Sequence, residues 1–440
     1  MLRTLARLFG LFSLVMGWLN LIEITRKSQL ALFVLKVAAG SIALVNAGLG
    51  GAAALFGLWR KDRLALLTGL IGGGLAVRHI VRVTAPHDAF EQTFGDGWRA
   101  RIAPELHQRM LPRRYTLPFP EPPPVIHLRD VVIGTTPETG KALLADLWKP
   151  PAWIQPTGLA IIYLHGSGWH YADKDFGTRL FFRHLAGQGH LVLDLAYSLA
   201  PGITLPTMVG DVKRAVVWLK THAAEHALNP ERVVLVGASA GGHLALLAAY
   251  TPHQPEWTPT DLQAADTSVR GVVSYYGPAD AEFYYRYTRA HFGDLWSGRS
   301  VNSRLSMKLT LYLLRAYERH LRGDGRLRLD EVGLLSPAQM LARVLGGTPD
   351  DIPDVYRQAS PITHVGPHCP PTLLINGAHD IAMKPAMGRR LQQALCAAGV
   401  PAVYIELPDT DHGLDLYAQR IAPAFHAATY DLERFLALLV

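Results

Sequence analysis

A serine near the middle of the chain is flanked by residues that could make it a nucleophile. Residues 237–241 read Gly-Ala-Ser-Ala-Gly and fit the pattern G-x-S-x-G around Ser239. The apolar stretch VVLV precedes the motif and an alanine- and leucine-rich stretch follows it, which predicts a strand-to-helix turn. A serine exposed on such a turn can attack a carbonyl carbon. The alternative is a serine that only caps the helix.

A base and an acid that could activate Ser239 follow it in the sequence. Asp380 comes after the apolar stretch LLINGA, and His412 comes after the stretch VYIELP. His412 would accept the proton of the serine hydroxyl, and Asp380 would orient the imidazole. Three other aspartates near His412 compete with Asp380 for the role of the acid: Asp409, Asp411 and Asp415.

A second glycine-rich loop could stabilise a developing oxyanion. The stretch HGSG at residues 165–168 follows the apolar stretch LAIIYL. Its last three residues have small side chains, so their backbone N–H groups can approach a substrate oxygen. The N–H of Ala240, at the start of the helix after the serine, would be a further donor. The predicted oxyanion hole consists of Gly166, Ser167, Gly168 and Ala240.

The residues from about 125 onward predict the scaffold that positions these loops. Short apolar runs typical of buried strands alternate with longer runs typical of helices, such as residues 176–189 and 208–227. Strands that alternate with helices predict a mostly parallel sheet with helices on both faces. Loops at the carboxyl ends of such strands meet at one edge, which is where the candidate residues fall.

Several stretches together resemble the α/β-hydrolase superfamily, in particular the hormone-sensitive-lipase-like carboxylesterases. They are HGSGW, LAYSLAP, DVKRAVVWLKTHAAEHALNPERVVLVGASAGGHLALLAA, GGTPDDIPDVYRQASPITHV, PPTLLINGAHD and DHGLD. The resemblance runs from about residue 125 to residue 440 and implies an α/β-hydrolase domain there. It also implies a serine esterase or lipase with Ser239, Asp380 and His412 as its triad.

Two positions depart from the pattern of that family. The usual HGGG reads HGSG here, and Ala238 stands where an acidic or bulky residue is frequent. Ser167 keeps its backbone N–H, so the oxyanion hole should survive while the pocket changes shape. His165 resembles a residue that orients the loop in that family, and we assign no proton transfer to it.

An insertion at about residues 281–345 is rich in aromatic and basic residues. Leucines among its basic residues, at rough helical spacing, predict a helical cap that packs on the catalytic domain. A lid that touches the membrane is the alternative. Either one would cover the serine and shape access to it.

The first 84 residues predict a membrane anchor. Three apolar runs without charge occupy residues 8–22, 37–59 and 64–77. The middle run of 23 residues is long enough for a helix to cross a hydrocarbon core of about 30 Å. We expect a multi-pass integral membrane protein with three spans, or two. Small residues at every fourth position, namely Ala39, Ala43, Ala47 and Gly51, and then Gly69 and Gly73, would allow the second and third helices to approach closely. The basic residues on the two sides of these spans are too evenly divided to predict the side of the catalytic domain.

A proline-rich stretch, LPFPEPPP, ends residues 85–124, which we expect to form an extended linker.

The 440 residues carry a formal net charge of +7, but the basic residues are scattered and no nucleic-acid-binding motif is present. Attraction to anionic lipid headgroups explains that charge. The two cysteines have no metal-site or disulfide spacing, and the predicted chemistry requires no metal and no cofactor.

The sequence therefore predicts a membrane-anchored serine carboxylesterase or lipase that acts on a small-molecule or lipid ester through an acyl-enzyme. An acyltransferase with the same triad is one alternative. A non-catalytic binding protein on a hydrolase scaffold is another. The acyl and alcohol specificity and the oligomeric state are not predicted.

Overall fold

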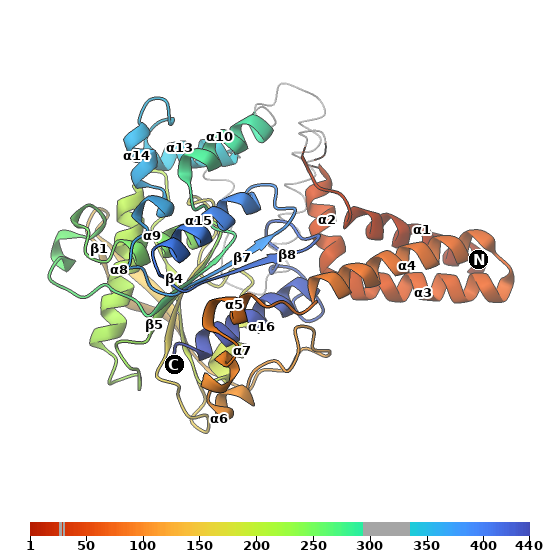
Figure 1. The fold of residues 1–440 in the computed structure, drawn as a ribbon, viewed down its shortest axis with the longest axis horizontal. Coiled ribbons are helices and arrows are strands. Elements are labelled where there is room, and N and C mark those ends of the chain that lie inside the picture. Colours follow the sequence, from red (N-terminus) through yellow and green to blue (C-terminus); the bar gives the residue numbers. More distant parts are fainter. Residues whose placement is uncertain (26–28, 30, 294–334) are drawn as a thin grey trace.

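A computed structural model describes residues 1–25, 29, 31–293 and 335–440. Its centre is an eight-stranded sheet with the order β1-β2-β4-β3-β5-β6-β7-β8 (Figure 1). Strands β3 to β8 run parallel to one another, whereas β2 is antiparallel to both β1 and β4. The strands are β1 (Ile126–Thr136), β2 (Lys141–Lys149), β3 (Ala160–Leu164), β4 (Leu191–Ala196), β5 (Val233–Ala238), β6 (Gly271–Tyr275), β7 (Thr372–Gly377) and β8 (Ala402–Leu407).

Helices cover both faces of this sheet. On one face, α7 (Arg179–Gly187) and α16 (Pro423–Ala437) pack together, with the rings of Phe181 and Phe425 6.2 Å apart. On the other face lie α8 (Leu205–Thr221), α9 (Ala240–Tyr250) and α15 (Pro385–Ala397). The central strands are buried on both faces, which explains why they are continuous apolar runs. The predicted α/β-hydrolase fold is confirmed.

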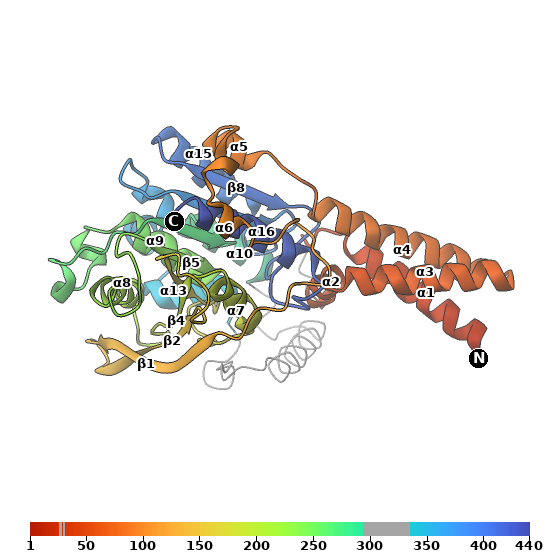
Figure 2. The same ribbon diagram turned by 90° about the horizontal axis from the view of Figure 1, so that it is seen from below.

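The N-terminal helices form a separate bundle that projects from the sheet domain. In Figure 2, α1 (Leu2–Leu19), α3 (Ala43–Arg60) and α4 (Arg63–Val83) lie side by side and extend away from it. Small residues allow the close approach: a Cβ atom on Gly50 would lie 2.6 Å from the backbone nitrogen of Gly73, and one on Gly69 would lie 2.5 Å from the carbonyl oxygen of Gly50. Gly69 and Gly73 make the predicted contacts, but Gly51 does not, because it faces open space.

The expected single helix over residues 37–59 is wrong. The run is divided between α2 (Ala31–Ser41) and α3, which are bent by 79° relative to each other at Ile42. Helix α2 lies at the base of the bundle, beside the sheet domain (Figure 1). Its Lys36 is only 2% exposed and forms an ion pair with Asp411 of that domain, so the first part of the apolar run contacts the sheet domain.

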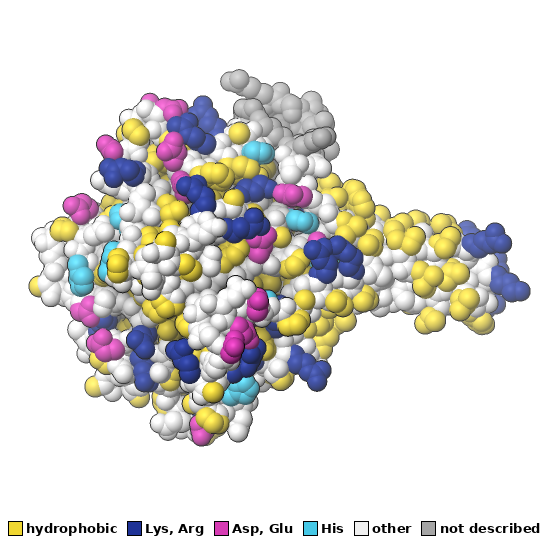
Figure 3. Space-filling model, in the orientation of Figure 1, with side chains coloured by type: hydrophobic (Ala, Val, Ile, Leu, Met, Phe, Trp, Pro, Cys, Tyr) yellow, Lys and Arg dark blue, Asp and Glu magenta, His cyan; other side chains and the backbone are white. Residues whose placement is uncertain are grey.

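The outer surface of the bundle is apolar. Helices α1 and α4 are each long and apolar enough to cross a membrane, and the bent pair α2 and α3 passes the same criterion only as a pair. Large apolar side chains are exposed along the bundle, and basic side chains gather at its far end (Figure 3). Exposed examples are Leu55, Leu58, Leu67, Leu70 and Val81. An apolar exterior of this kind is typical of a helix that faces lipid.

Residues 85–124 differ from the extended linker that we expected. They contain α5 (Ala89–Phe94), a 3₁₀ turn (Trp98–Arg101) and the short helix α6 (Pro104–His107). Phe90 and Trp98 are 2% exposed, stack with ring centroids 4.8 Å apart, and belong to the same hydrophobic core as the sheet. Aromatic residues therefore hold this segment against the hydrolase domain, although its end is rich in proline.

The described parts of the insertion are helical. Helix α10 (Ala281–Phe292) begins it and α13 (Pro337–Leu345) ends it, and these two helices contact each other. Helix α14 (Pro353–Gln358) follows and packs against α10. The leucine-rich stretch that we expected to form a cap helix lies outside the described residues. Helix α10 lies at the carboxyl edge of the sheet, where its Phe292 belongs to the same small hydrophobic cluster as Ile381, which follows β7 (Figure 1).

Candidate active site

Ser239 lies on a sharp turn between β5 and α9. Its backbone has φ 53° and ψ −118°, a combination that costs a residue with a side chain about 1–3 kcal/mol. The Ser239 N–H donates a hydrogen bond to the carbonyl of Tyr275, with 2.9 Å between nitrogen and oxygen. The serine thus occupies a strained turn rather than an ordinary cap, and its side chain makes no capping hydrogen bond to α9.

Glycines on each side of Ser239 allow this turn. A Cβ atom on Gly237 would lie 2.2 Å from the carbonyl oxygen of Gly241. A Cβ atom on Gly241 would lie 2.0 Å from the carbonyl oxygen of Leu164 at the end of β3. Both contacts are with backbone, which cannot move aside as the end of a side chain can. The two glycines of the motif are therefore required by the close approach of β3, β5 and α9.

His412 and Asp380 complete a chain of hydrogen bonds that begins at Ser239. The Ser239 Oγ atom lies 3.0 Å from His412 Nε2, and His412 Nδ1 lies 2.9 Å from Asp380 Oδ2. Asp380 follows β7 and His412 follows β8, so the carboxyl ends of three parallel strands bring the residues together. The structure thus assembles the three residues that the sequence predicted.

Asp380 is well suited to orient an imidazole. It is fully buried, and its Oδ1 atom accepts hydrogen bonds from the backbone nitrogens of Ala382 at 2.8 Å and Met383 at 2.6 Å. These bonds fix the carboxylate and leave Oδ2 for His412. The other three aspartates have different partners, namely arginines for Asp409, Lys36 and two backbone amides for Asp411, and Tyr276 for Asp415.

The electrostatic environment of His412 favours its protonated form. Burial by itself would lower the pKa of His412, but the charge of Asp380 and its hydrogen bond outweigh burial and raise the pKa above its ordinary value of 6.5. The ring of Tyr276 lies 4.5 Å from that of His412, and the Tyr276 hydroxyl donates a hydrogen bond to Asp415. Tyr276 and Asp415 thus form the wall of the site beside the imidazole.

The glycine-rich loop after β3 lies directly against Ser239. A Cβ atom on Gly166 would lie 3.3 Å from the Cβ atom of Ser239, so the backbone of the loop is adjacent to the serine. The Oγ atom of Ser167 lies 2.7 Å from the Tyr197 hydroxyl, which in turn donates to the carbonyl of His165 at 2.8 Å. Ser167 therefore uses its side chain to fasten the loop, and the departure from HGGG has a structural role.

His165 itself is a neutral structural residue. Its side chain is buried, and burial lowers its pKa to about 3. The imidazole stacks on Tyr197, with ring centroids 4.5 Å apart and an interplanar angle of 18°. The imidazole thus packs the start of the glycine-rich loop against Tyr197, and its loop-orienting role without proton transfer stays a prediction.

Helices of the insertion pack on this loop. A Cβ atom on Gly168, which has φ +56°, would lie 2.5 Å from the sulfur of Met340 on α13. A hydrogen bond of 3.0 Å joins His170 Nε2 to the carbonyl oxygen of Met340. Trp169 is buried and contacts Tyr284 of α10 edge to face. The insertion therefore shapes the entrance beside the predicted oxyanion hole.

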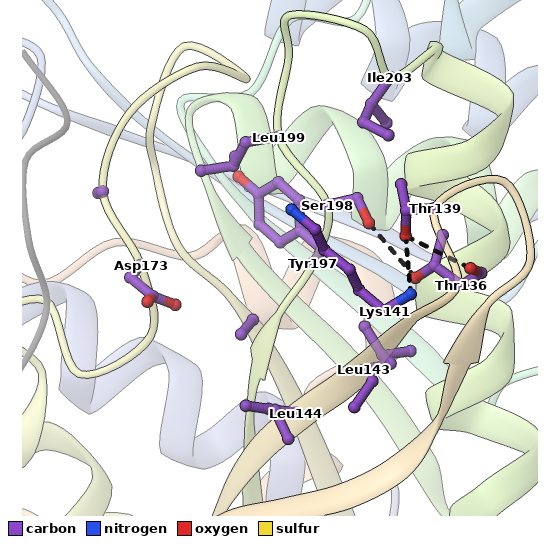
Figure 4. A pocket seen from close by; sticks show the side chains of 13 residues that line it. Thr136, Thr139, Lys141, Leu143, Leu144, Asp173, Tyr197, Ser198, Leu199 and Ile203 are labelled. Carbon is purple, nitrogen blue, oxygen red and sulfur yellow. Dashed lines mark hydrogen bonds between the residues drawn. The ribbon is translucent and has the colours of Figure 1, made fainter. Parts of the chain in front are cut away.

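A polar cavity of about 230 Å³ lies beyond this loop, between the β1–β2 end of the sheet and the loop after β4. Figure 4 shows Thr136, Lys141, Ser198 and Ile203 around it. Tyr197 also lines it, so one of its walls contacts the glycine-rich loop. None of the residues that line this cavity is Ser239, His412 or Asp380. We therefore place the reaction at Ser239 and not in this cavity.

Residues that the sequence did not indicate also belong to the surroundings of the site. Tyr276 follows β6 and has a positive φ of 40°, but only its position at the carboxyl edge of the sheet could have pointed to it. Lys36 comes from the predicted anchor, and its contact with Asp411 spans 375 positions. Within the described parts of the chain, no group of three or more His, Cys, Asp or Glu side chains could hold a metal ion.

Comparisons with known proteins relate the sheet domain to esterases. Residues 145–307 match the family model described as BD-FAE. The chain is 30% identical over 314 residues to the probable carboxylic ester hydrolase LipM of Mycobacterium tuberculosis, and the aligned residues cover 71% of this chain and 61% of LipM. It is 28% identical over 311 residues to the esterase LipC of the same organism, with 70% of this chain and 65% of LipC covered. The chain thus spans less than two thirds of these relatives.

The fold is shared with a solved structure of an esterase. A truncated carbohydrate esterase from gut microbiota superposes with a TM-score of 0.50 at 18% identity, which covers 72% of this chain and 97% of that one. Esterase 2 of Thermogutta terrifontis superposes with a TM-score of 0.48 at 20% identity, which covers 72% and 93%. The chain has the α/β-hydrolase fold, and its sequence is similar to those of carboxylic ester hydrolases.

Proposed function

We propose that this protein is a membrane-anchored serine carboxylesterase. The observation that carries the proposal is the hydrogen-bonded chain from Ser239 Oγ through His412 to Asp380, with distances of 3.0 and 2.9 Å. A serine on a strained turn with a base and a buried acid in line is the arrangement that acyl transfer requires. The names of the curated relatives, among them a probable carboxylic ester hydrolase, support an ester as the substrate.

In the first half of the proposed reaction, Ser239 Oγ attacks the carbonyl carbon of the ester while His412 Nε2 accepts the hydroxyl proton. The carbonyl oxygen becomes an oxyanion, which the backbone N–H groups of Ala240 and of residues 166–168 stabilise. Asp380 stabilises the imidazolium that forms. His412 then returns the proton to the alkoxide oxygen as the carbon–oxygen bond breaks, and the alcohol leaves behind an acyl-enzyme.

In the second half, a water molecule replaces the alcohol. His412 accepts a proton from the water as its oxygen attacks the acyl carbon, and the same N–H groups hold the second oxyanion. Collapse of this intermediate returns the proton to Ser239 Oγ and releases the carboxylic acid. An alcohol in place of water would give an acyltransferase with the same residues, and the ratio of acid to new ester in the products distinguishes the two reactions.

The anchor part of the proposal is supported by the surface of the N-terminal bundle. We infer that α1 and α4 cross the bilayer and that α3, which packs against both, crosses with them, since the outward side chains are apolar and the charged residues lie near the helix ends. At the domain end, Arg78 and Arg82 both pair with Asp409, at 2.9 and 3.1 Å. The catalytic domain would thus lie at the membrane surface, where either a soluble or a lipid ester can reach it.

Activity-based labelling tests the proposal directly. Membranes that contain the full chain are treated with a serine-reactive fluorophosphonate, and hydrolysis of p-nitrophenyl butyrate is measured in parallel. Wild-type protein should be labelled and active, and Ser239→Ala should be neither. The matched control is Ser268→Ala, because Ser268 precedes β6 at the opposite edge of the sheet. Labelling that persists in Ser239→Ala would contradict the assignment of the nucleophile.

A further inference from the structure

A buried ion pair joins the N-terminal helices to the loop that carries His412. Lys36 Nζ on α2 lies 3.0 Å from Asp411 Oδ2, and both side chains are only 1% exposed. Asp411 directly precedes His412 in the loop between β8 and α16. A segment that the sequence suggests is only an anchor thus contributes a charge beside the proposed catalytic base.

The second oxygen of Asp411 holds two backbone amides together. Asp411 Oδ1 accepts hydrogen bonds from the nitrogen of Ile381 at 2.9 Å and from the nitrogen of His412 at 2.8 Å. Ile381 directly follows Asp380, so one carboxylate ties the loop of the acid to the loop of the base. Any movement of Asp411 would change the positions of both residues relative to Ser239.

Asp411 needs a cation to stay charged and in place. Its burial raises the pKa of the carboxyl group, the nearby charge of Asp380 acts in the same direction, and Lys36 opposes both. An unpaired charge in this position would either take up a proton or draw water into the core. Lys36 is therefore the group that allows a carboxylate to accept both amide hydrogen bonds.

Other contacts between the N-terminal helices and the two loops are more exposed. Lys384 Nζ pairs with Glu23 Oε1 at 2.6 Å, and the Glu23 side chain is 44% exposed. The arginines that pair with Asp409 are 40% and 45% exposed. One member of each of these pairs is thus open to solvent, which weakens the pair and leaves that side chain solvated if its partner is removed. Lys36 differs because neither member of its pair can be solvated when the other is removed.

We propose that Lys36 is a positioning residue for the reaction at Ser239. It touches neither the serine nor the imidazole. It acts through Asp411, which fixes the position of the Asp380 loop relative to the His412 loop. The N-terminal helices are then part of the catalytic structure and not a removable anchor. This inference rests on the proposed esterase function.

A double-mutant cycle on the full chain in detergent tests the inference. The variants are Lys36→Met, Asp411→Asn and the double variant, and Arg82→Gln is the matched control, because it also removes a cation from an anchor-to-loop pair. For each variant we would measure kcat and KM for p-nitrophenyl butyrate, the rate of fluorophosphonate labelling, and the melting temperature. An asparagine at 411 keeps an oxygen for both amides but needs no cation.

We expect each single variant to lower kcat and the labelling rate on the order of 10- to 100-fold, as small displacements of catalytic groups do, and to leave KM within about twofold. The double variant should recover most of the loss, because neither buried charge remains unpaired. Arg82→Gln should stay near wild type, since Asp409 keeps Arg78. If one single variant does not fold, the other single and the double variant still report the recovery.

Three results would overturn the inference. One is a Lys36→Met variant with unchanged kcat and labelling, and another is a loss in KM alone. The third is a double variant in which the two losses multiply. A wild-type chain that neither hydrolyses esters nor reacts with the fluorophosphonate would instead overturn the proposed function, and this inference with it. Activity of the wild-type chain thus separates the two failures.

Discussion

Asp380 Oδ2 lies 2.9 Å from His412 Nδ1, and the carboxylate is shielded from bulk solvent because Asp380 is fully buried. The hydrogen bond fixes the imidazole so that Nε2 points at Ser239. Three other aspartates are close to His412 in the sequence, yet each is occupied by another partner. The acid of the proposed triad is therefore set by the strand ends and not by proximity along the chain.

Asp380→Asn should leave the fold nearly unchanged and lower kcat by about 10⁴-fold, because an amide can hold the imidazole in the wrong tautomer. The measurement is steady-state hydrolysis of a p-nitrophenyl ester, with circular dichroism to verify folding. Asp415→Asn is the control, since Asp415 accepts its hydrogen bond from Tyr276. Normal turnover in Asp380→Asn together with a collapse in Asp415→Asn would transfer the acid role.

The pH dependence of kcat/KM should show an acid limb above pH 6.5, the ordinary pKa of histidine, because Asp380 raises the pKa of His412. Only the neutral imidazole can accept the serine proton, so activity is lost as the pH falls through the raised pKa. Removal of the Asp380 charge in Asp380→Asn should shift the acid limb to lower pH. A limb that stays in place would mean that Asp380 does not act on the titrating group.

Gly237→Ala should destabilise the hydrolase domain. The added methyl group would meet the carbonyl oxygen of Gly241 at 2.2 Å, and we expect a loss at the upper end of the usual ~1–3 kcal/mol for overpacking. Thermal unfolding in detergent measures the change. Gly97→Ala is the matched control, because nothing lies within 4 Å of the added atom there. Equal melting temperatures for the two variants would show that the turn is looser than described.

The full chain should remain in the membrane pellet through high salt and alkaline carbonate, and detergent should release it. Attraction through basic residues alone would be screened within a Debye length of about 10 Å at 0.1 M salt. An apolar helix surface has no such dependence on salt. Fractionation with an immunoblot is the measurement, and protein in the carbonate supernatant would contradict the spanning helices.

The strand ends and the three proposed catalytic residues could be predicted because their signals are local. Ser239 lies in a five-residue motif, and Asp380 and His412 each follow an apolar strand. The helix break at Ile42 has no local signal in the uncharged run, and the contact of Lys36 that accompanies it is with a residue 375 positions away, so neither could be predicted. The packing of residues 85–124 could not be predicted from the sequence. The prolines at the end of this segment indicate an extended chain, whereas the role of Phe90 and Trp98 is visible only from their burial in the core of the sheet domain.

The two ion pairs of Asp409 have a consequence for kinetics. Arg78 and Arg82 belong to a helix that we infer to cross the bilayer, and Asp409 is three residues before His412 in the sequence. In the proposed membrane-anchored form, these ion pairs would keep the catalytic loop at a fixed distance from the bilayer surface, so the loop would not follow a substrate into bulk solution. For a lipid ester, encounter would be diffusion in a plane, so turnover would follow the mole fraction of the ester among the lipids. Dilution of the whole suspension with buffer would leave that rate unchanged.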